Sequence, residues 1–175
     1  DSLTWVNNRS SFFQELNLRL GGGQDFQIIV VCMRNFSYIN QRYGHKNGDC
    51  LLIRTASWLN GLISGGQTFR IGNMEFAVLL PYTSSKEAEE NLSAVYERFN
   101  KPWSMGSSQI ELEADFAELI HTDQPWDATD IMEFLQYSLS EAKKREEHLL
   151  RFNNTSYLEL EKRRHIVQLL HKVIE

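Results

Sequence analysis

The sequence contains no long run of apolar residues. No segment approaches the roughly 20 consecutive apolar residues that a membrane-spanning helix needs, so no membrane contact is expected from this chain. The N-terminus also lacks the pattern of a secretory signal peptide and opens directly on the first motif described below, as a piece of a longer protein would. We therefore expect a cytoplasmic domain, and membrane anchoring of the parent protein stays open.

The chain has no surplus of positive charge. It carries 18 Lys and Arg against 23 Asp and Glu, which gives a net charge of −5. Such a balance creates no field that would attract nucleic acid or an anionic membrane surface. Neither is expected as a partner.

Cysteine is scarce, with Cys32 and Cys50 as its two occurrences. We interpret them as buried, reduced thiols of a cytosolic protein. A P-loop, a Gly-x-Ser-x-Gly turn and a Cys-x-x-Cys pair are absent, and the histidines follow no metal-ligand spacing. These common signatures therefore assign no function.

The remaining pattern fits one globular domain in which strands and helices alternate. The hydrophobic fraction of 42% and the charged fraction of 23% are ordinary for such a domain. Expected helices are Ser10–Leu20, Phe36–Tyr43, Gly48–Leu62, Ser84–Phe99, Asp127–Leu150 (where a break stays open) and Tyr157–Glu175. Expected strands are Phe26–Met33, Gln67–Ile71, Phe76–Pro81 and Ile110–Ile120. The order of these elements predicts an α+β fold, a sheet covered by helices.

Four separated motifs carry a family resemblance. They are Asp1-Ser-Leu-Thr-Trp-Val-Asn-Asn-Arg9, then Phe36, Asn40 and Tyr43-Gly-His-Lys-Asn-Gly-Asp49, then Arg70-Ile-Gly-Asn-Met-Glu-Phe76, and last Ala142-Lys143. In this order and spacing they resemble the GGDEF domains of bacterial diguanylate cyclases. The third motif is the family signature, Gly-Gly-Asp-Glu-Phe, in altered form.

The resemblance implies a ferredoxin-like palm with a mainly antiparallel central sheet, similar to nucleotidyl cyclases. It also implies a reaction in which two GTP molecules meet across a dimer and each 3′-hydroxyl attacks the α-phosphate of the other. Magnesium ions assist that chemistry and require hard oxygen ligands. In the family, these ligands are an Asp at the end of the first central strand and the acid at the third position of the signature.

Both of these acids are replaced here. Cys32 stands at the strand end and Met74 in the signature, while Asn73 replaces its second glycine. A thiol is a soft ligand and a thioether is an uncharged, weak acceptor, so neither suits magnesium. We therefore expect no catalytic residues, no cofactor and a lost Mg²⁺ site. Glu75 should not replace Met74, because adjacent strand residues point to opposite faces.

The nucleotide-binding positions are partly kept. Asn40 and Asp49 match the family's ligands of the guanine edge, Gly72 keeps the first glycine of the signature, and Lys143 matches a phosphate-binding lysine. The next phosphate ligand, an arginine in the family, falls on Glu147, which would repel phosphate. GTP is therefore a candidate ligand. The alternative is that Asn40 and Asp49 only cap helices or close the turn between them.

Arg34 replaces a further acid of the family at the end of the first central strand. Its guanidinium could contact phosphate where a metal is missing, or it could be a solvated surface arginine. Both interpretations stay open.

These observations predict an inactive GGDEF domain over residues 1–154, followed by a linker helix over residues 155–175. The linker resembles the helix that leads into an EAL phosphodiesterase domain in tandem proteins. The expected role is regulatory or guanine-nucleotide sensing, with an attached EAL domain as partner and a homodimer as a possible assembly. The alternatives are an active cyclase with an unusual metal site and a dimerisation scaffold that binds no nucleotide.

Overall fold

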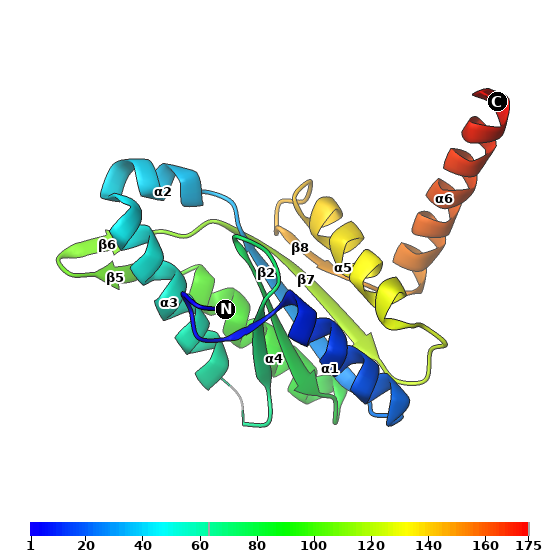
Figure 1. The fold of residues 1–175 in the computed structure, drawn as a ribbon, viewed down its shortest axis with the longest axis horizontal. Helices are drawn as coiled ribbons and strands as arrows, with labels where there is room; N and C mark the ends of the chain where they lie inside the picture. Colours follow the sequence, from blue (N-terminus) through cyan, green and yellow to red (C-terminus); the bar gives the residue numbers. More distant parts are fainter. Residues whose placement is uncertain (63, 175) are drawn as a thin grey trace.

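A computed structural model describes residues 1–62 and 64–174, without the side chains of residues 173 and 174. Two parts of the expected linker helix therefore lie outside the described residues. They are the side chain of Val173 and the whole of Glu175. The chain forms one six-stranded sheet in the order β1-β3-β4-β2-β7-β8 and a separate two-stranded hairpin, β5-β6. Figure 1 shows the sheet in the middle of the molecule, with helices packed around it.

The strands are β1 (Asn7–Asn8), β2 (Phe26–Met33), β3 (Gln67–Arg70), β4 (Glu75–Pro81), β5 (Trp103–Met105), β6 (Ser108–Ile110), β7 (Ala114–His121) and β8 (Leu149–Arg151). The helices are α1 (Arg9–Gly21), α2 (Phe36–Tyr43), α3 (His45–Gly61), α4 (Ser85–Phe99), α5 (Ala128–Ala142) and α6 (Asn154–Ile174).

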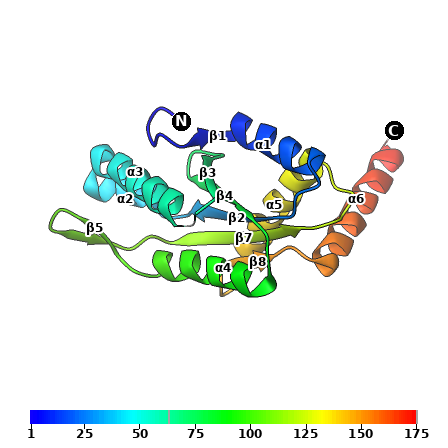
Figure 2. The same ribbon diagram turned by 90° about the horizontal axis from the view of Figure 1, so that it is seen from below.

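Strand β2 forms the centre of the fold because almost every residue in it is apolar and buried. It pairs antiparallel with β4 on one side and β7 on the other. Its side chains alternate between two apolar clusters, one with residues of α1, α5 and α6, the other with residues of α2, α3 and α4. Figure 2 shows α1 and α4 on opposite sides of the sheet. The predicted α+β palm with its mainly antiparallel sheet is confirmed.

Two predicted elements are wrong in extent. The expected strand Ile110–Ile120 is two strands, β6 and β7, because the polar residues Glu111 and Glu113 interrupt it. The expected helix Asp127–Leu150 ends at Ala142. The charged residues that follow form a turn, and Leu149–Arg151 then pairs parallel with β7 as the edge strand β8.

Helix α6 is attached to the domain through its first half. Tyr157 packs against Trp126 and Phe134, and Leu160 is buried in the same apolar cluster. The Arg163 guanidinium also pairs with a carboxylate of α5, 3.0 Å from Glu141 Oε1. The second half projects away from the domain (Figure 1). Its apolar residues Ile166, Val167, Leu169 and Leu170 are exposed, as is Leu158 in the first half.

The interpretation of the two cysteines as buried thiols is correct in part. Cys32 is half-buried in the sheet, but Cys50 is exposed because it lies on the outer side of α3. No helix within the described part of the chain is long and apolar enough to cross a membrane.

Candidate functional site

The signature motif forms the tip of the β3–β4 hairpin, where the sequence places it. Ile71 N–H donates to the Glu75 carbonyl at 2.9 Å, and the Arg70 guanidinium donates to the Asn73 carbonyl at 2.8 Å. A Cβ on Gly72 would lie 3.0–3.2 Å from the Glu75 side chain. The glycine therefore lets the Glu75 side chain fold closely over the turn.

The N-terminal segment pins this hairpin to the domain. The Asp1 carboxylate lies 3.2 Å from Arg70 Nη1, and Arg9 Nη1 donates to the Ile71 carbonyl at 3.3 Å. Both ends of the first sequence motif therefore hold the base of the signature turn.

Cys32, at the end of β2, lies between two carboxylates. The strand register places it directly opposite Glu75 of β4 and Asp115 of β7, so all three side chains lie on the same face of the sheet. Burial, followed by the charges of Glu75 and Asp115, raises the pKa of the Cys32 thiol to about 11. The raised pKa disfavours the thiolate, and a sulfur ligand in either form is too soft to suit magnesium.

Met74 does not lie with Cys32. Its side chain packs against the other apolar cluster, the one that contains residues of α2, α3 and α4. Its carbonyl accepts a 3.0 Å hydrogen bond from Met33 N–H, which ties the hairpin to the end of β2. The residue of the signature that faces Cys32 is Glu75, whose carboxylate also accepts from Gln136 at 3.4 Å.

Asp115 belongs to the candidate site by its position opposite Cys32, and the sequence analysis missed it. Its side chain is only 5% exposed, and it accepts from His148 Nδ1 at 2.9 Å and lies 3.2 Å from Arg34 Nε. Arg34 also approaches Glu113 at 3.7 Å. The available signal was an acid within a buried strand that also carries Glu118 and His121, and the partners of Asp115 became visible only with the pairing of β2, β7 and β8.

The positions that the resemblance assigns to guanine binding meet at the turn between α2 and α3. Gly48 packs so closely on Asn40 that a Cβ there would overlap Asn40 Oδ1. That oxygen is buried and has no hydrogen-bond partner within the described residues. Asp49 follows Gly48 and is exposed. Burial lowers the pKa of Arg70, and the negative charge of Asp49 partly offsets this by raising it.

These side chains are not helix caps, which is one branch of the alternative interpretation; the other, closure of the turn, is consistent with the 2.9 Å hydrogen bond from Gly44 N–H to the Asn40 carbonyl. The residues at the cap positions of α2 and α3 are Asn35 and Gly44. A buried carbonyl oxygen without a donor is unfavourable. Asn40 Oδ1 is thus a buried acceptor without a donor among the described residues, packed against Gly48.

Lys143 and Glu147 lie at the C-terminal end of α5. Lys143 is the C-cap residue of that helix, and its charge acts on the Cys32 thiol. Glu147 is exposed in the following turn, where its carbonyl accepts from Tyr96 at 3.0 Å. The lysine therefore belongs to the site around Cys32, and no arginine follows it at the position of Glu147.

The donor set around Cys32 suits magnesium poorly. Magnesium prefers several oxygen ligands in octahedral geometry. Here a protonated thiol stands between Glu75 and Asp115, and Asp115 is already bound by Arg34 and His148. Among residues 1–62 and 64–174, no three His, Cys, Asp or Glu side chains are arranged to hold a metal ion.

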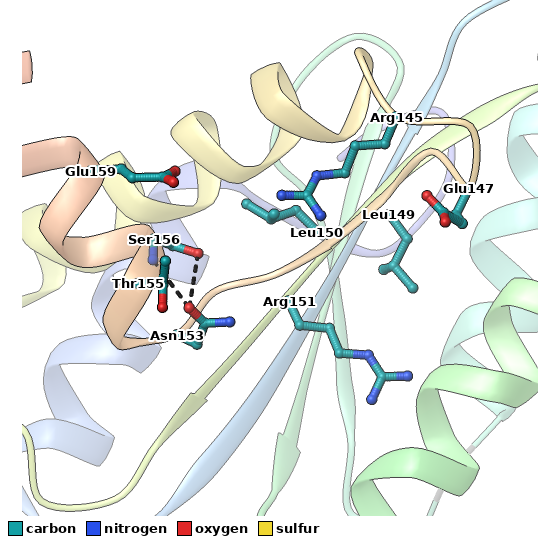
Figure 3. Close-up of a pocket in the computed structure, with 9 residues that line it drawn as sticks. All are labelled: Arg145, Glu147, Leu149, Leu150, Arg151, Asn153, Thr155, Ser156 and Glu159. Atoms are coloured by element: carbon teal, nitrogen blue, oxygen red, sulfur yellow. Dashed lines mark hydrogen bonds between the residues drawn. The ribbon is translucent and has the colours of Figure 1, made fainter.

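A separate pocket of about 320 Å³ lies where α5, β8 and α6 meet (Figure 3). Two arginines and two glutamates, Arg145, Arg151, Glu147 and Glu159, contribute to its lining. The start of α6 forms one wall, where Asn153 Oδ1 accepts from Ser156 N–H at 3.1 Å. Because its charges are mixed, this pocket favours no one class of ligand.

The palm-like sheet, the hairpin signature and the α2–α3 turn define a nucleotidyl cyclase-like domain. The chain belongs to the GGDEF family, because the family model "Diguanylate cyclase, GGDEF domain" matches residues 1–148.

The chain is similar to several characterised relatives. It is 30% identical over 102 residues to the diguanylate cyclase VdcA of Vibrio cholerae, covering 58% of this chain and 30% of that protein. Its fold matches the GGDEF domain of PA1120 (TpbB or YfiN) from Pseudomonas aeruginosa with a TM-score of 0.80 and 21% identity, over 92% of this chain and 98% of that one. It also matches the diguanylate cyclase SiaD, solved with its activator SiaC, from Pseudomonas aeruginosa (TM-score 0.75, 23% identity, 87% and 61% coverage). The chain spans about 30% of the length of VdcA.

Proposed function

We propose that this chain is a catalytically silent GGDEF domain that acts as a regulatory, guanine-sensing module in a bacterial cyclic di-GMP signalling protein. The observation that carries the proposal is the place of Cys32, a thiol at the end of β2 opposite Glu75 and Asp115, where the family resemblance places a metal-binding acid. The charge stabilisation that a metal supplies to phosphoryl transfer is worth several kcal/mol. Its loss lowers the rate by about 10³-fold or more.

The carboxylates on the same face do not restore the metal site in this proposal. Asp115 is neutralised by Arg34 and hydrogen-bonded to His148. Glu75 remains, but a single carboxylate gives a magnesium ion too few protein ligands to stabilise the transferring phosphate. Met74 adds nothing, because its side chain packs into an apolar cluster.

The α2–α3 turn supports guanine sensing. The unpartnered Asn40 Oδ1 can accept from an amino or imino group of a base after a small rotation of the side chain. The Asp49 carboxylate can accept from guanine N1–H and N2–H₂, whereas adenine presents no such pair of donors there. The turn thus keeps groups that favour guanine over adenine.

The projecting half of α6 supports the role of a connector to a further domain, and an attached EAL phosphodiesterase is the partner that we propose. Its exposed apolar residues, such as Ile166 and Leu170, lie beyond the part of the helix that packs on the domain. The diguanylate cyclase SiaD, which has the same fold, is solved in complex with its activator SiaC. This supports the proposal that contact with a partner protein is how this domain exerts control. A homodimer is a second assembly that we propose to test.

The experiment is an assay for cyclic di-GMP, with GTP and either Mg²⁺ or Mn²⁺. We expect no product above a control without protein. The alternative function, an active cyclase with an unusual metal site, draws on Glu75, which faces Cys32. Product that disappears on Glu75→Gln would establish that alternative and overturn the proposal.

The same protein titrated with guanine and adenine ligands separates a sensing module from a scaffold that binds no nucleotide. Weak binding of guanine ligands with no binding of adenine ligands is the expected result.

A further inference from the structure

Strand β8 connects the surroundings of Cys32 to the start of α6. It consists of Leu149–Arg151 and pairs parallel with β7 at the end of the strand order. His148, which precedes the strand, contacts Asp115, the carboxylate opposite Cys32. Helix α6 begins shortly after the strand, at Asn154. Because so short an edge strand has few ladder hydrogen bonds, the contacts at its two ends decide whether it stays attached.

His148 holds the first end of β8. Its Nδ1 donates to Asp115 Oδ1 at 2.9 Å, since an ionised carboxylate can only accept, and its carbonyl accepts from Phe116 N–H at 2.7 Å. Its backbone φ of 51° lies in the left-handed region, which is uncommon for a residue other than glycine and costs free energy. The two hydrogen bonds offset this cost, so the conformation of the turn depends on them.

Arg151 holds the second end. Its guanidinium donates to both carboxylate oxygens of Glu89 on α4, with Nη2 2.9 Å from Oε1, and its Nε lies 3.8 Å from Glu118 Oε2. Glu118 is only 5% exposed and accepts from Gln27 Nε2 at 2.7 Å. The Gln27 side chain, fully buried in β2, accepts in turn from Asn91 of α4 at 3.0 Å. The end of β8 is therefore tied to a polar network that reaches the central strand.

Phe152 relates the position of β8 to that of α6. Its N–H donates to the Glu118 carbonyl at 2.8 Å, and its ring stacks on Phe134 of α5 with 4.5 Å between the ring centroids. The Tyr157 ring of α6 packs edge-on against the same Phe134 ring at 5.8 Å. A shift of β8 therefore disturbs the aromatic contacts on which the first turn of α6 rests.

The structure leaves space for such a shift. Two cavities, of about 320 Å³ and 340 Å³, both border Arg151 and Asn153. Figure 3 shows the first of them, where the chain runs from β8 directly into α6. A strand end that borders cavities has fewer packed neighbours and moves at lower cost than one inside a close-packed core.

We propose that β8 is a detachable link that couples the surroundings of Cys32 to the connector helix α6. While His148 holds Asp115, β8 stays paired with β7 and α6 keeps its place on α5. When that contact breaks, β8 leaves the sheet edge, Phe152 moves and the first turns of α6 lose their support. This inference rests on the proposed regulatory role, to which it adds the route of control, and it does not depend on guanine binding.

The test is hydrogen–deuterium exchange of the backbone amides, followed by mass spectrometry, on the chain with His148→Ala. Asp115 keeps its ion pair with Arg34 in this variant, so the buried carboxylate is not left without a cation. We expect exchange to become about tenfold faster in both Leu149–Arg151 and residues 154–160, with α4 and β2 unchanged. His165→Ala, which changes an exposed histidine of α6 itself, is the matched control and should leave both segments unchanged.

Three outcomes would overturn the inference. Faster exchange in β8 alone would mean that α6 does not follow the strand. Faster exchange throughout the domain would make His148 a support of the whole fold and not of one link. Unchanged exchange in both segments would mean that the contact with Asp115 does not hold the strand.

Two further variants examine the two ends of β8 separately. His148→Asn keeps a side-chain N–H donor and tolerates a left-handed backbone, so the slow exchange of residues 154–160 should return. Arg151→Gln releases the second end and should speed exchange in residues 154–160 as His148→Ala does. Fast exchange with His148→Asn, or slow exchange with Arg151→Gln, would contradict the link.

Failure of this inference and failure of the proposed function are distinguishable. Production of cyclic di-GMP would refute the silent domain and leave the exchange result standing. An α6 that does not respond to His148→Ala removes only the route of control.

Discussion

The α2–α3 turn and the β3–β4 hairpin carry two groups of candidate site residues, and the two elements differ in what they retain of the family pattern. The turn keeps both its geometry and its polar groups, with Asn40 packed on Gly48 and Asp49 beside them. The hairpin keeps its geometry, with Gly72 at the tip, but its acid is replaced by Met74. The hairpin backbone is therefore kept, although the acid that the family carries at the position of Met74 is not.

The reason for this difference is that the two kinds of feature have different physical causes. The hairpin is maintained by strand pairing and by apolar packing, and Met74 contributes to that packing as an acid could not. Metal binding depends on charged oxygen atoms that add nothing to the core. A domain can therefore lose metal binding and still keep the hairpin.

The reactivity of the two cysteines tests the surroundings of Cys32 most directly. The Cys32 thiol, with its pKa raised from 9.0 to about 11, has about a hundredth of the ordinary thiolate fraction at pH 8. Cys50 is exposed on α3. We therefore expect iodoacetamide to modify Cys50 about a hundredfold faster than Cys32, as followed by peptide mass spectrometry.

The pH dependence has a definite sign. Raising the pH from 8 towards 11 deprotonates Cys32, so its alkylation rate should climb throughout this range. Cys50→Ser isolates the slow reaction for measurement. Comparable rates for the two cysteines at pH 8 would mean that burial and the charges of Glu75 and Asp115 do not raise the pKa of the Cys32 thiol as described.

The change Gly48→Ala tests the α2–α3 turn, where Asn40 packs on Gly48. The new Cβ would overlap Asn40 Oδ1 and lie 3.1 Å from the Phe36 ring, so the Asn40 side chain must turn away. We expect guanine affinity to fall about twentyfold, about 2 kcal/mol, with a smaller loss of ~1 kcal/mol in the free energy of unfolding. Calorimetry and urea denaturation measure the two quantities.

Gly61→Ala is the control, since a Cβ at that position meets no atom within 4 Å. It should change neither binding nor stability appreciably. If Gly48→Ala binds guanosine as the unmodified chain does, Asn40 is not a ligand of the base.

Asp49→Ala should have the smallest effect of the three. It removes one exposed acceptor, so guanine affinity should fall by ~1 kcal/mol and the preference over adenine should narrow. Titration with guanosine and adenosine measures the preference. A loss that is equal for both bases would show that Asp49 acts through its charge alone and does not recognise the guanine edge.

Much of the scaffold was predictable because its signals are local. The apolar run Phe26–Met33 gave β2 with its observed ends, and the turn around Gly72 gave the β3–β4 hairpin. The end of α5 and strand β8 were not predictable in this way. Leu149–Arg151 is short and follows a charged turn, so only its pairing with β7 makes it a strand.

The sequence by itself determined which chemical groups stand at the key positions, since a thiol or a thioether is a poor magnesium ligand in any fold. Only the tertiary structure decided which groups meet. Glu75, Cys32 and Asp115 come from three strands and lie side by side only because of the register between them, and a slip of one residue would turn each side chain to the other face. His148 reaches Asp115 only because β8 adds to the edge of β7. Identity is a property of one position, whereas charge balance and pKa depend on neighbours that the chain brings together only on folding.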